Sequence, residues 1–318
     1  MNRRKALLIM SVTAVCAGFV ATLSHATAPG TNGRIAFMRY RLHDAPYQAE
    51  LFTVNSDGSG ERKVTHVAPG RMDDFPDWAP DGSRIVFQRC GGPRCYIWSV
   101  RPGGRGLKRL SPSCPHRPGT TKCADNSEPV YSPDGRHIAF TADSVLMVAD
   151  ANLRHAHPVG RGYQPGWSPD GKKLAFVWKP GNRSAVFVEN SDGTGRHRIT
   201  PFPLRAGDHP DWSPDGTRIL FNTGGENHVR GQNLFTVRPD GTGLRQLTHY
   251  SGKTQTNLLN GSFSPDGESI VFATVVGAVN PQGAGLDDAF VMSADGTDSR
   301  PVTRARNWDG APDWGPGH

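Results

Sequence analysis

Three motifs that mark enzyme classes are absent from this sequence of 318 residues. There is no G-x-S-x-G nucleophile elbow, no G-x-x-x-x-G-K-[ST] phosphate loop and no H-E-x-x-H zinc motif. The sequence therefore gives no sign of the hydrolases, nucleotide-binding proteins and metalloproteases that carry these motifs. We predict a protein that is not an enzyme and that holds no cofactor and no metal.

A surface dominated by one sign of charge is also absent. The chain has 36 Lys and Arg against 29 Asp and Glu, and both signs are scattered along it. The most basic stretch, residues 101–109, contains three glycines, which is typical of a turn with solvated charges. Because no basic stripe is interleaved with aromatic residues, we do not expect a nucleic-acid partner.

Only one long apolar run occurs near the start of the chain, at residues 6–20. It follows a basic start at residues 3–5 and precedes Ser24-His25-Ala26, a small-x-small cleavage pattern. A transmembrane anchor is the alternative, but the run is shorter than the ~20 residues that cross a bilayer. We predict a signal peptide at residues 1–26 and one mature domain at residues 27–318 without a stable membrane span. Such a bacterial protein would be extracytoplasmic, either periplasmic or secreted.

Cysteine is scarce, with five residues in the chain, and Cys16 lies in the predicted signal peptide. The other four are even in number, which favours disulfides in an exported protein. The spacing indicates that Cys90 and Cys95 close one hairpin loop and that Cys114 and Cys123 close the next loop. A four-cysteine zinc site is the alternative, although the spacing is not the paired C-x-x-C of a zinc ribbon.

What the sequence does contain is an internal repeat. A phrase of an aromatic residue, Ser or Ala, Pro-Asp-Gly, two variable residues and an apolar triplet ending in Phe occurs at residues 78–87, 131–140, 167–176, 212–221 and 263–272. One further step reaches Trp314, and the other half of that unit stands at the opposite end as Asn32-Gly-Arg-Ile-Ala-Phe37. We therefore predict that the two ends of the mature chain complete one unit together.

Each unit also has a second half, such as Leu51-Phe-Thr-Val54, an Asp-Gly turn and Arg62-Lys-Val-Thr65. Pro-Asp-Gly and Asp-Gly-Thr-Gly are turn sequences. The apolar Ile-Ala-Phe type of run is typical of a strand that is covered on both faces. The pattern predicts an all-β fold: a six-bladed β-propeller with four antiparallel strands per blade, closed by strands from both termini. The repeated aromatic residue would fill the space between blades.

The phrase Pro-x-Trp-Ser-Pro-Asp-Gly-x-x-Ile-Ala-Phe, followed by Leu-Phe-x-Val and Arg-x-Leu-Thr, resembles the TolB-type propeller repeat, a relative of the WD repeat. The resemblance covers nearly the whole mature chain. It implies a propeller of the bacterial envelope, and TolB itself is a periplasmic partner of the Tol–Pal system that docks a lipoprotein at the propeller mouth. TolB carries an α/β domain before its propeller, whereas here we expect the first strand near Arg34 and no such domain.

Polar side chains recur where the chain enters the innermost strand of each predicted blade. These positions would lie at the mouth of the central channel, and they form our set of candidate ligand-binding residues: Asp73, Asp74, Glu128, Tyr163, Gln164, Asp208, His209, Asn260 and Asp309. An acidic ring would suit a basic peptide, or a cation held by carboxylates and His209. The alternative is that these side chains bond the backbone of the turns before the strands.

Three functions are compatible with these patterns. The first is a monomeric scaffold that binds a protein, a peptide or another envelope component at its loop face. The second is a metal-dependent carbohydrate lyase, because some oligogalacturonate lyases have similar repeats and place histidines around a metal in the channel. The resemblance to those enzymes implies seven blades and several histidines, whereas His209 alone lies near the mouth here. The third is a structural module whose partner docks on the blade edges. We predict the scaffold.

Overall fold

The computed structural model of the chain describes residues 30–41, 47–92, 94–111, 125–223, 232–250, 256–276, 288–304 and 307–317. The predicted signal peptide and the pair Cys114 and Cys123 lie outside these residues. Within them, the chain consists of strands and turns and one short 3-10 helix, η1 (Phe202–Leu204). The predicted all-β class is confirmed.

The strands follow one another at short intervals, as the repeat predicts. Their bounds are β1 (Asn32–Arg41), β2 (Gln48–Val54), β3 (Arg62–Lys63), β4 (Arg71–Trp78), β5 (Ile85–Gly91), β6 (Cys95–Val100), β7 (Lys108–Arg109), β8 (Asn126–Tyr131), β9 (His137–Ala142), β10 (Val145–Asp150), β11 (His157–Arg161), β12 (Tyr163–Trp167), β13 (Lys173–Trp178), β14 (Ala185–Asn190), β15 (His197–Arg198), β16 (Ala206–Trp212), β17 (Ile219–Thr223), β18 (Leu234–Val237), β19 (Arg245–Gln246), β20 (Thr256–Phe263), β21 (Ser269–Val276), β22 (Ala289–Ser293), β23 (Arg300–Pro301) and β24 (Trp308–Pro316).

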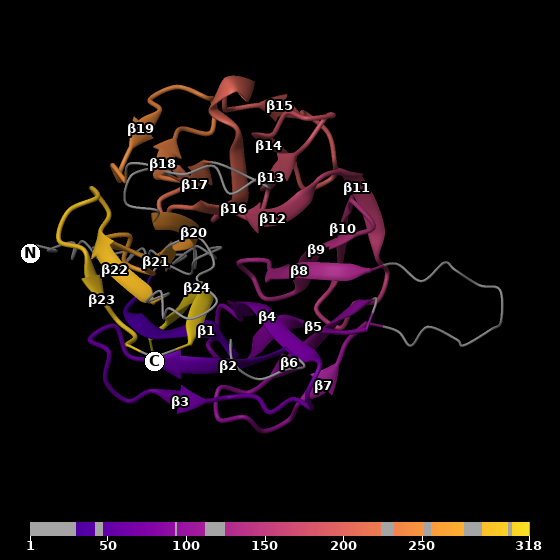
Figure 1. Cartoon of the computed structure of the whole chain (residues 1–318). Coiled ribbons are helices and arrows are strands. Elements are labelled where there is room, and N and C mark those ends of the chain that lie inside the picture. The colour runs from indigo at the N-terminus through magenta and orange to yellow at the C-terminus, as the bar shows by residue number, and fades with distance from the viewer. Residues whose placement is uncertain are drawn as a thin grey trace, which may run out of the picture.

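Hydrogen bonding divides the strands into five sheets. Four of them contain four antiparallel strands each, β8 to β11, β12 to β15, β16 to β19 and β20 to β23. The fifth has the order β24-β1-β2-β4-β5-β6-β7, with β3 on β2, and its halves meet at one parallel pair, Ala49 with Met72. Figure 1 shows the sheets following one another around a common centre.

The two ends of the described chain lie side by side in one sheet (Figure 1). β1 pairs with β24 in antiparallel register, so that Ile35 lies opposite Trp314 and Arg39 lies opposite Asp309. This pairing joins the two half-units that the sequence places at opposite ends. Among the described residues, no helix has the length and apolar character needed to span a membrane.

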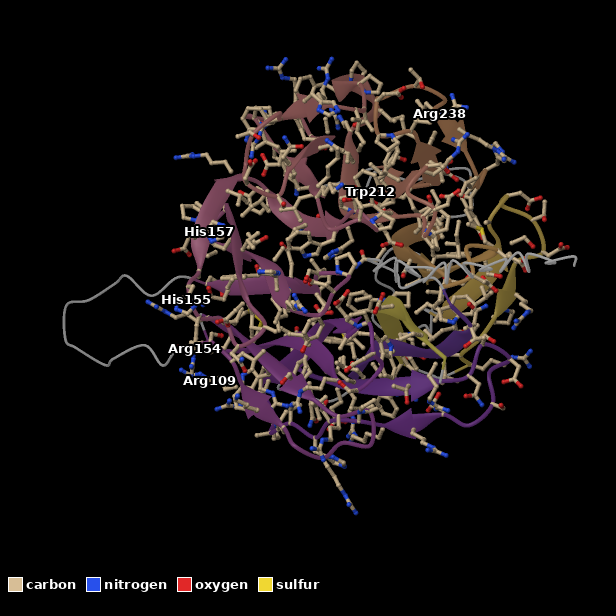
Figure 2. All side chains as sticks on the ribbon, turned by 180° about the vertical axis from the view of Figure 1, so that it is seen from behind. Arg109, Arg154, His155, His157, Trp212 and Arg238 are labelled. Atoms are coloured by element: carbon tan, nitrogen blue, oxygen red, sulfur yellow. A yellow bond between two sulfur atoms is a disulfide. The ribbon has the colours of Figure 1, made fainter. Side chains whose placement is uncertain are left out.

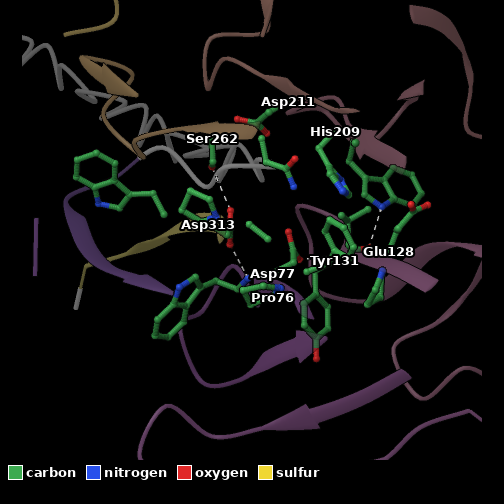
Figure 3. A pocket seen from close by; sticks show the side chains of 18 of the residues that line it. Pro76, Asp77, Glu128, Tyr131, His209, Asp211, Ser262 and Asp313 are labelled. Atoms are coloured by element: carbon green, nitrogen blue, oxygen red, sulfur yellow. Dashed lines mark hydrogen bonds between the residues drawn. The ribbon is translucent and has the colours of Figure 1, made fainter. Parts of the chain in front are cut away.

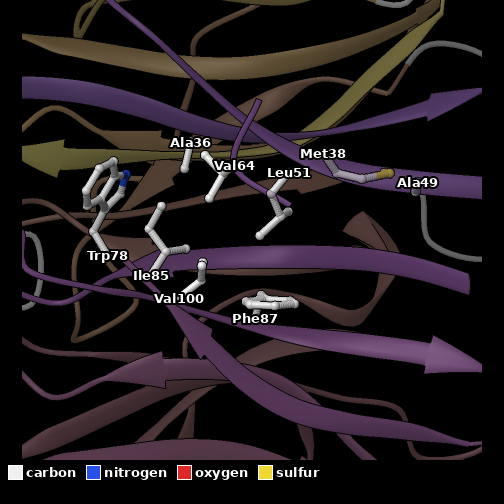
Figure 4. Close-up of a cluster of buried hydrophobic side chains, with 9 residues drawn as sticks. All are labelled: Ala36, Met38, Ala49, Leu51, Val64, Trp78, Ile85, Phe87 and Val100. Atoms are coloured by element: carbon white, nitrogen blue, oxygen red, sulfur yellow. The ribbon is translucent and has the colours of Figure 1, made fainter. Parts of the chain in front are cut away.

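The core lies between neighbouring strand groups, because the second strand of each repeat is covered on both faces. In β5, for example, six consecutive residues from Ile85 to Cys90 are buried. The phenylalanine that ends the repeated phrase is fully buried in five cases, Phe37, Phe87, Phe176, Phe221 and Phe272. The repeated aromatic residue is also buried throughout, with exposures between 2% and 8%. Figure 4 shows one such cluster, in which Trp78 and Phe87 pack with side chains of β1 and β2.

Both repeated turn sequences form as predicted. In the Ser-Pro-Asp-Gly turns, the serine hydroxyl donates a hydrogen bond to the aspartate; the Ser168–Asp170 oxygens are 2.6 Å apart. In the Asp-Gly-Thr-Gly turns, the carboxylate accepts the backbone N–H two residues later, as Asp192 does from Thr194 at 2.9 Å. Gly193 there has a φ of 86°, which only glycine adopts readily. These carboxylates therefore stabilise their own turns by accepting hydrogen bonds within them.

The threonine that ends the second half of the repeat has a structural task. Its hydroxyl oxygen accepts a hydrogen bond from a backbone N–H of the third strand of the unit. The distances are 2.9 Å from Leu51 to Thr65 and 3.0 Å from Leu234 to Thr248. This contact holds the outermost chain segment against the third strand of the unit, where the two-residue strands alone would add few ladder bonds.

Candidate functional site

Six inner strands converge on one cavity at the centre of the molecule, β4, β8, β12, β16, β20 and β24. The cavity has a volume of about 90 Å³. Its lining includes residues 75–78, 128–131, 165–167, 209–211, 260–262 and 311–314. The same short segment of each repeat, ending at or just before the aromatic residue, therefore faces the centre.

Each inner strand carries a β-bulge at the same position, three residues before the aromatic residue. The bulge residue has positive φ in every case: Phe75 (50°), Glu128 (55°), Gln164 (57°), His209 (39°), Asn260 (38°) and Ala311 (46°). The pairing register of each inner strand shifts there. A bulge bends a strand and redirects its side chains, and left-handed backbone is unfavourable for residues other than glycine. Its sixfold recurrence makes this ring of bulge residues, which we call the mouth ring, a built feature of the fold.

Four of the predicted site residues belong to the mouth ring. Glu128, His209 and Asn260 line the cavity, and Gln164 lies beside two of them. The backbone N–H of Gln164 donates to Glu128 Oε2 at 2.9 Å, and its Nε2 lies 3.4 Å from His209 Nε2. The sequence prediction rests on polar side chains and therefore does not include the other two members, Phe75 and Ala311, which are apolar.

Two aromatic side chains, those of Phe75 and His209, contact each other across the centre of the mouth ring. The centroid of Phe75, on β4, lies 4.3 Å from that of His209, on β16, with an interplanar angle of 39°. Such a contact between side chains from non-neighbouring inner strands narrows the entrance to the cavity. Phe75 and His209 both line the cavity, so this contact forms part of its wall.

Two predicted acidic residues are paired with arginines instead of facing the cavity. Asp73 is buried and accepts two hydrogen bonds from Arg89, at 2.5 Å and 2.6 Å. Asp309 is buried and accepts two from Arg39, at 2.6 Å and 2.7 Å. Burial raises the pKa of both carboxyls, and the arginine beside each acts in the opposite direction. Neither residue is among those that line the cavity.

The remaining predicted residues have separate surroundings. Enclosure by protein, with Glu128 and Asp73 nearby, raises the pKa of Asp74 to about 7, although Asp74 accepts the backbone N–H of Phe75 at 2.7 Å. The Tyr163 hydroxyl donates to Ser144 Oγ at 2.8 Å. The side chain of Asp208 lies outside the described part of the structure.

Three aspartates that the sequence prediction missed face the cavity, Asp77, Asp211 and Asp313 (Figure 3). Each stands directly before a repeated tryptophan and accepts a backbone N–H from another inner strand. The donors are Tyr131 to Asp77 at 2.7 Å, Phe263 to Asp211 at 2.7 Å and Trp78 to Asp313 at 2.8 Å. These carboxyls therefore connect the inner strands to one another. Their recurrence before the tryptophan was a readable signal in the sequence.

The three cavity aspartates titrate far from their ordinary range. Desolvation raises the pKa of Asp211 to about 8 and that of Asp313 to about 6. Desolvation, with Asp313 nearby, raises the pKa of Asp77 well above its usual value. None of the described residues that line the cavity is Lys or Arg, so no cation offsets the burial. At neutral pH the cavity therefore holds partly protonated carboxyls.

The predicted disulfide in the first cysteine pair is confirmed. Cys90 and Cys95 are bonded and face each other across the β5–β6 hairpin. The strand order puts this hairpin end on the same side as the starts of the inner strands. Across the described residues, no group of three or more His, Cys, Asp or Glu is arranged to hold a metal ion.

The fold and the cavity define an all-β protein of the β-propeller class, with inner strands arranged around a central cavity. A family model described as TolB beta propeller domain matches residues 146–318. Because this match covers more than half of the chain, the protein belongs to the TolB β-propeller family, as the repeat resemblance predicted.

Individual relatives agree on the fold and differ in activity. The Tol-Pal system protein TolB of Hahella chejuensis is 30% identical over 172 residues, which are 50% of this chain and 32% of the relative. Oligogalacturonate lyase of Dickeya dadantii is 25% identical over 191 residues, 50% of this chain and 47% of the enzyme. The crystal structure of TolB from Acinetobacter baumannii has a TM-score of 0.69 at 20% identity, covering 90% of this chain and 67% of that one. The chain thus spans about half the length or less of these curated relatives.

Proposed function

We propose that this protein is an exported, non-catalytic propeller that binds a protein, a peptide or another component of the bacterial envelope at the mouth ring. In this proposal the eight-stranded sheet represents two blades, so that the molecule has six blades and β24 with β1 closes the circle. The signal peptide at residues 1–26 would deliver the mature domain, residues 27–318, outside the cytoplasm as a monomer.

The observation that carries the proposal is the mouth ring and its Phe75–His209 bridge. The cavity behind the bridge, at about 90 Å³, is far smaller than the roughly 300–1,000 Å³ of ordinary small-molecule pockets. A ligand would therefore contact the rim from outside, which suits a peptide segment or a protein surface. Aromatic residues on such a rim supply binding energy at low entropic cost. Relatives named as Tol-Pal system proteins support an envelope partner.

The mature chain, immobilised and incubated with an envelope extract of the native organism, provides the test. We expect the native protein to retain a partner that Phe75→Asn/His209→Asn loses, because asparagine tolerates positive φ while the two rings disappear. A matched control is Leu107→Asn/Leu244→Asn, which removes two exposed leucines from the hairpin turns at the opposite end of the sheets. Equal retention by all three proteins would contradict binding at the mouth ring.

A metal-dependent lyase is the second candidate, favoured by the similarity to oligogalacturonate lyase. It requires ligands for the metal, and the described residues offer His209 beside Glu128 and the cavity aspartates without a three-residue metal group. Incubation with oligogalacturonates and added divalent metal distinguishes the candidates. Formation of unsaturated product that disappears in His209→Asn would replace the scaffold proposal, whereas no product with a retained partner would support it.

A further inference from the structure

Positive charge is concentrated in one part of the chain. Residues 151–205 contain nine Lys or Arg against three Asp or Glu, so this stretch carries six of the formal net charge of +7. Its acidic residues are already engaged: Glu189 binds Arg196, while Asp170 and Asp192 bond their own turns. The excess of cations therefore has no counterpart within the stretch itself.

A pocket on this part of the molecule gathers three of the arginines. It lies between the β13–β14 loop, β15 and η1, and its volume is about 450 Å³. The residues that line it are Asn182, Arg183, Arg198, Pro201, Phe202, Pro203 and Arg205. No carboxylate is among these lining residues, and the size suits a ligand of a few tens of atoms or fewer.

The arginines of the pocket are positioned by a rigid frame. The guanidinium carbons of Arg183 and Arg198 lie 4.7 Å and 4.5 Å from the centroid of Phe202. Phe202 itself packs on the core, 6.4 Å from the Phe187 ring. Two prolines flank it and limit the backbone, and Arg205 follows in left-handed conformation, with φ of 49°, and its N–H donates to Phe202 O. The charged groups are thus held before a ligand arrives, which reduces the entropic cost of binding.

At three other places among the described residues, an arginine that stacks on aromatic rings also binds a carboxylate. Arg39 lies over Phe37 and Phe52 and binds Asp309. Arg89 lies over Phe87 and Trp98 and binds Asp73. Arg196 lies over Phe176 and Trp178 and binds Glu189. These three cases share an arrangement of ring, guanidinium and carboxylate. A fourth arginine, Arg109, lies over Tyr96 and donates to the backbone oxygen of Ser111 instead.

At Phe202 the ring and two guanidinium groups are present, but the carboxylate is not. Among the described residues, no acceptor takes a hydrogen bond or ion pair from the side chains of Arg183, Arg198 or Arg205. Two like charges on one ring repel each other, and the planar guanidinium is suited to bidentate binding of carboxylate or phosphate. An anion in the pocket would relieve the repulsion and complete the arrangement.

We propose that the pocket formed by Arg183, Arg198, Phe202 and Arg205 binds an oxyanion, either a carboxylate or a phosphate, carried by a small ligand. Carboxylate and phosphate both present two or more negatively charged oxygens, which can accept paired hydrogen bonds from the N–H groups of a guanidinium. A phosphate ester and an acidic sugar are the two sources that present this chemistry at this size. The site is separate from the mouth ring and does not depend on the function proposed for it.

Calorimetric titration of the mature chain tests the proposal. The probes are inorganic phosphate and a galacturonic acid trimer, used at low ionic strength and at concentrations up to about 10 mM because salt screens exposed charges. We expect at least one probe to bind, and Arg183→Gln/Arg198→Gln to raise its Kd at least about tenfold. Phosphate alone as the ligand would indicate a phosphate ester, and the trimer alone would indicate an acidic sugar.

The matched control removes the same charge outside the pocket. Arg154→Gln/Arg161→Gln changes two exposed arginines of the neighbouring sheet, and Arg154 lies at the outer rim in Figure 2. We expect this variant to change the Kd less than about twofold. The proposal is overturned if neither probe binds, if the pocket variant binds like the native protein, or if both variants weaken binding equally, which would indicate only general charge attraction.

Discussion

β4 and β24 each contain a pair of aspartates four residues apart, with Asp74 as a third aspartate in β4, and the two members of each pair have opposite environments. The first member, Asp73 or Asp309, is buried and held by an arginine. The second member, Asp77 or Asp313, faces the central cavity and accepts one backbone N–H from another inner strand. Two carboxyls on the same strand therefore have different roles, and the arginine makes the difference.

The comparison shows that aspartates of one strand differ in their titration according to whether an arginine binds them. A bidentate arginine lowers the pKa of the buried carboxyl beside it and so opposes the effect of burial, and removal of either partner leaves the other buried and uncompensated. A carboxyl without a cation is pushed towards its neutral form, as the pKa of about 6 for Asp313 and about 8 for Asp211 indicates. The arginine-paired residues are thus predicted to matter for stability, and the cavity residues for its dependence on pH.

The largest effect is expected when one partner of a structural pair is removed. Asp73→Leu leaves the Arg89 charge buried and unpaired, which should lower the free energy of unfolding by about 3–5 kcal/mol. Urea unfolding at neutral pH measures this change. The double variant Asp73→Leu/Arg89→Met should recover most of the loss, and a double variant no more stable than the single one would show that the pair is not the cause.

An intermediate effect that depends on pH is expected at the cavity. Because the folded pKa of Asp211, about 8, exceeds its ordinary value, the folded state holds an extra proton between about pH 4 and pH 8. The stabilisation of the folded state by this proton is fully present below about pH 4 and is lost as the pH rises towards about 8. Asp211→Asn cannot titrate and still accepts the Phe263 N–H, so it should be more stable than the native protein at pH 8, by about 1–3 kcal/mol.

Urea unfolding of both proteins at pH 5 and pH 8 checks this prediction, with a smaller difference expected at pH 5. The control is Asp215→Asn, because hydrogen bonds to Ser213 and Thr217 lower the pKa of Asp215 despite its partial burial. Its contribution is present above its ordinary pKa and is lost only at more acidic pH, so the slope between pH 5 and 8 should not change. A native protein whose stability stays constant over this range would refute the assignment of Asp211.

The smallest effect is expected from the loss of one hydroxyl hydrogen bond to a cavity aspartate. Ser262 Oγ donates to Asp313 Oδ1 at 3.1 Å, so Ser262→Ala removes one hydrogen bond and should cost about 1 kcal/mol. The midpoint of urea unfolding at pH 8 reports it. A loss of unfolding free energy as large as that of Asp73→Leu would contradict the proposed difference between the cavity aspartates and the arginine-paired aspartates.

Most of the fold could be predicted from the sequence because the repeat encodes local chemistry. The turn residues, the apolar strand and the buried aromatic residue each specify one element, and the half-units at the two ends predict the β1–β24 pairing. Blade closure through that pairing remains part of the proposal. The signal peptide stays a prediction, since residues 1–29 lie outside the described structure.

The site was harder to predict because polarity alone does not say which way a side chain points. The bulge redirects the residue three positions before the aromatic residue, and a polar side chain two positions earlier points elsewhere. One readable signal was overlooked: Asp73 and Asp309 occur in the two units that also have arginine two residues after the buried phenylalanine, Phe87-Gln-Arg89 and Phe37-Met-Arg39. The Phe75–His209 contact, in contrast, depends on strands far apart in sequence.

The most direct test of binding at the mouth ring is site-specific photo-crosslinking in an envelope extract. One protein carries a photoreactive residue in place of Phe75, and a second carries it in place of Leu107, at the opposite end of the sheets. The account predicts a discrete adduct from position 75 and none from position 107. An adduct from position 107 alone would place the partner on the other face and contradict the proposed function.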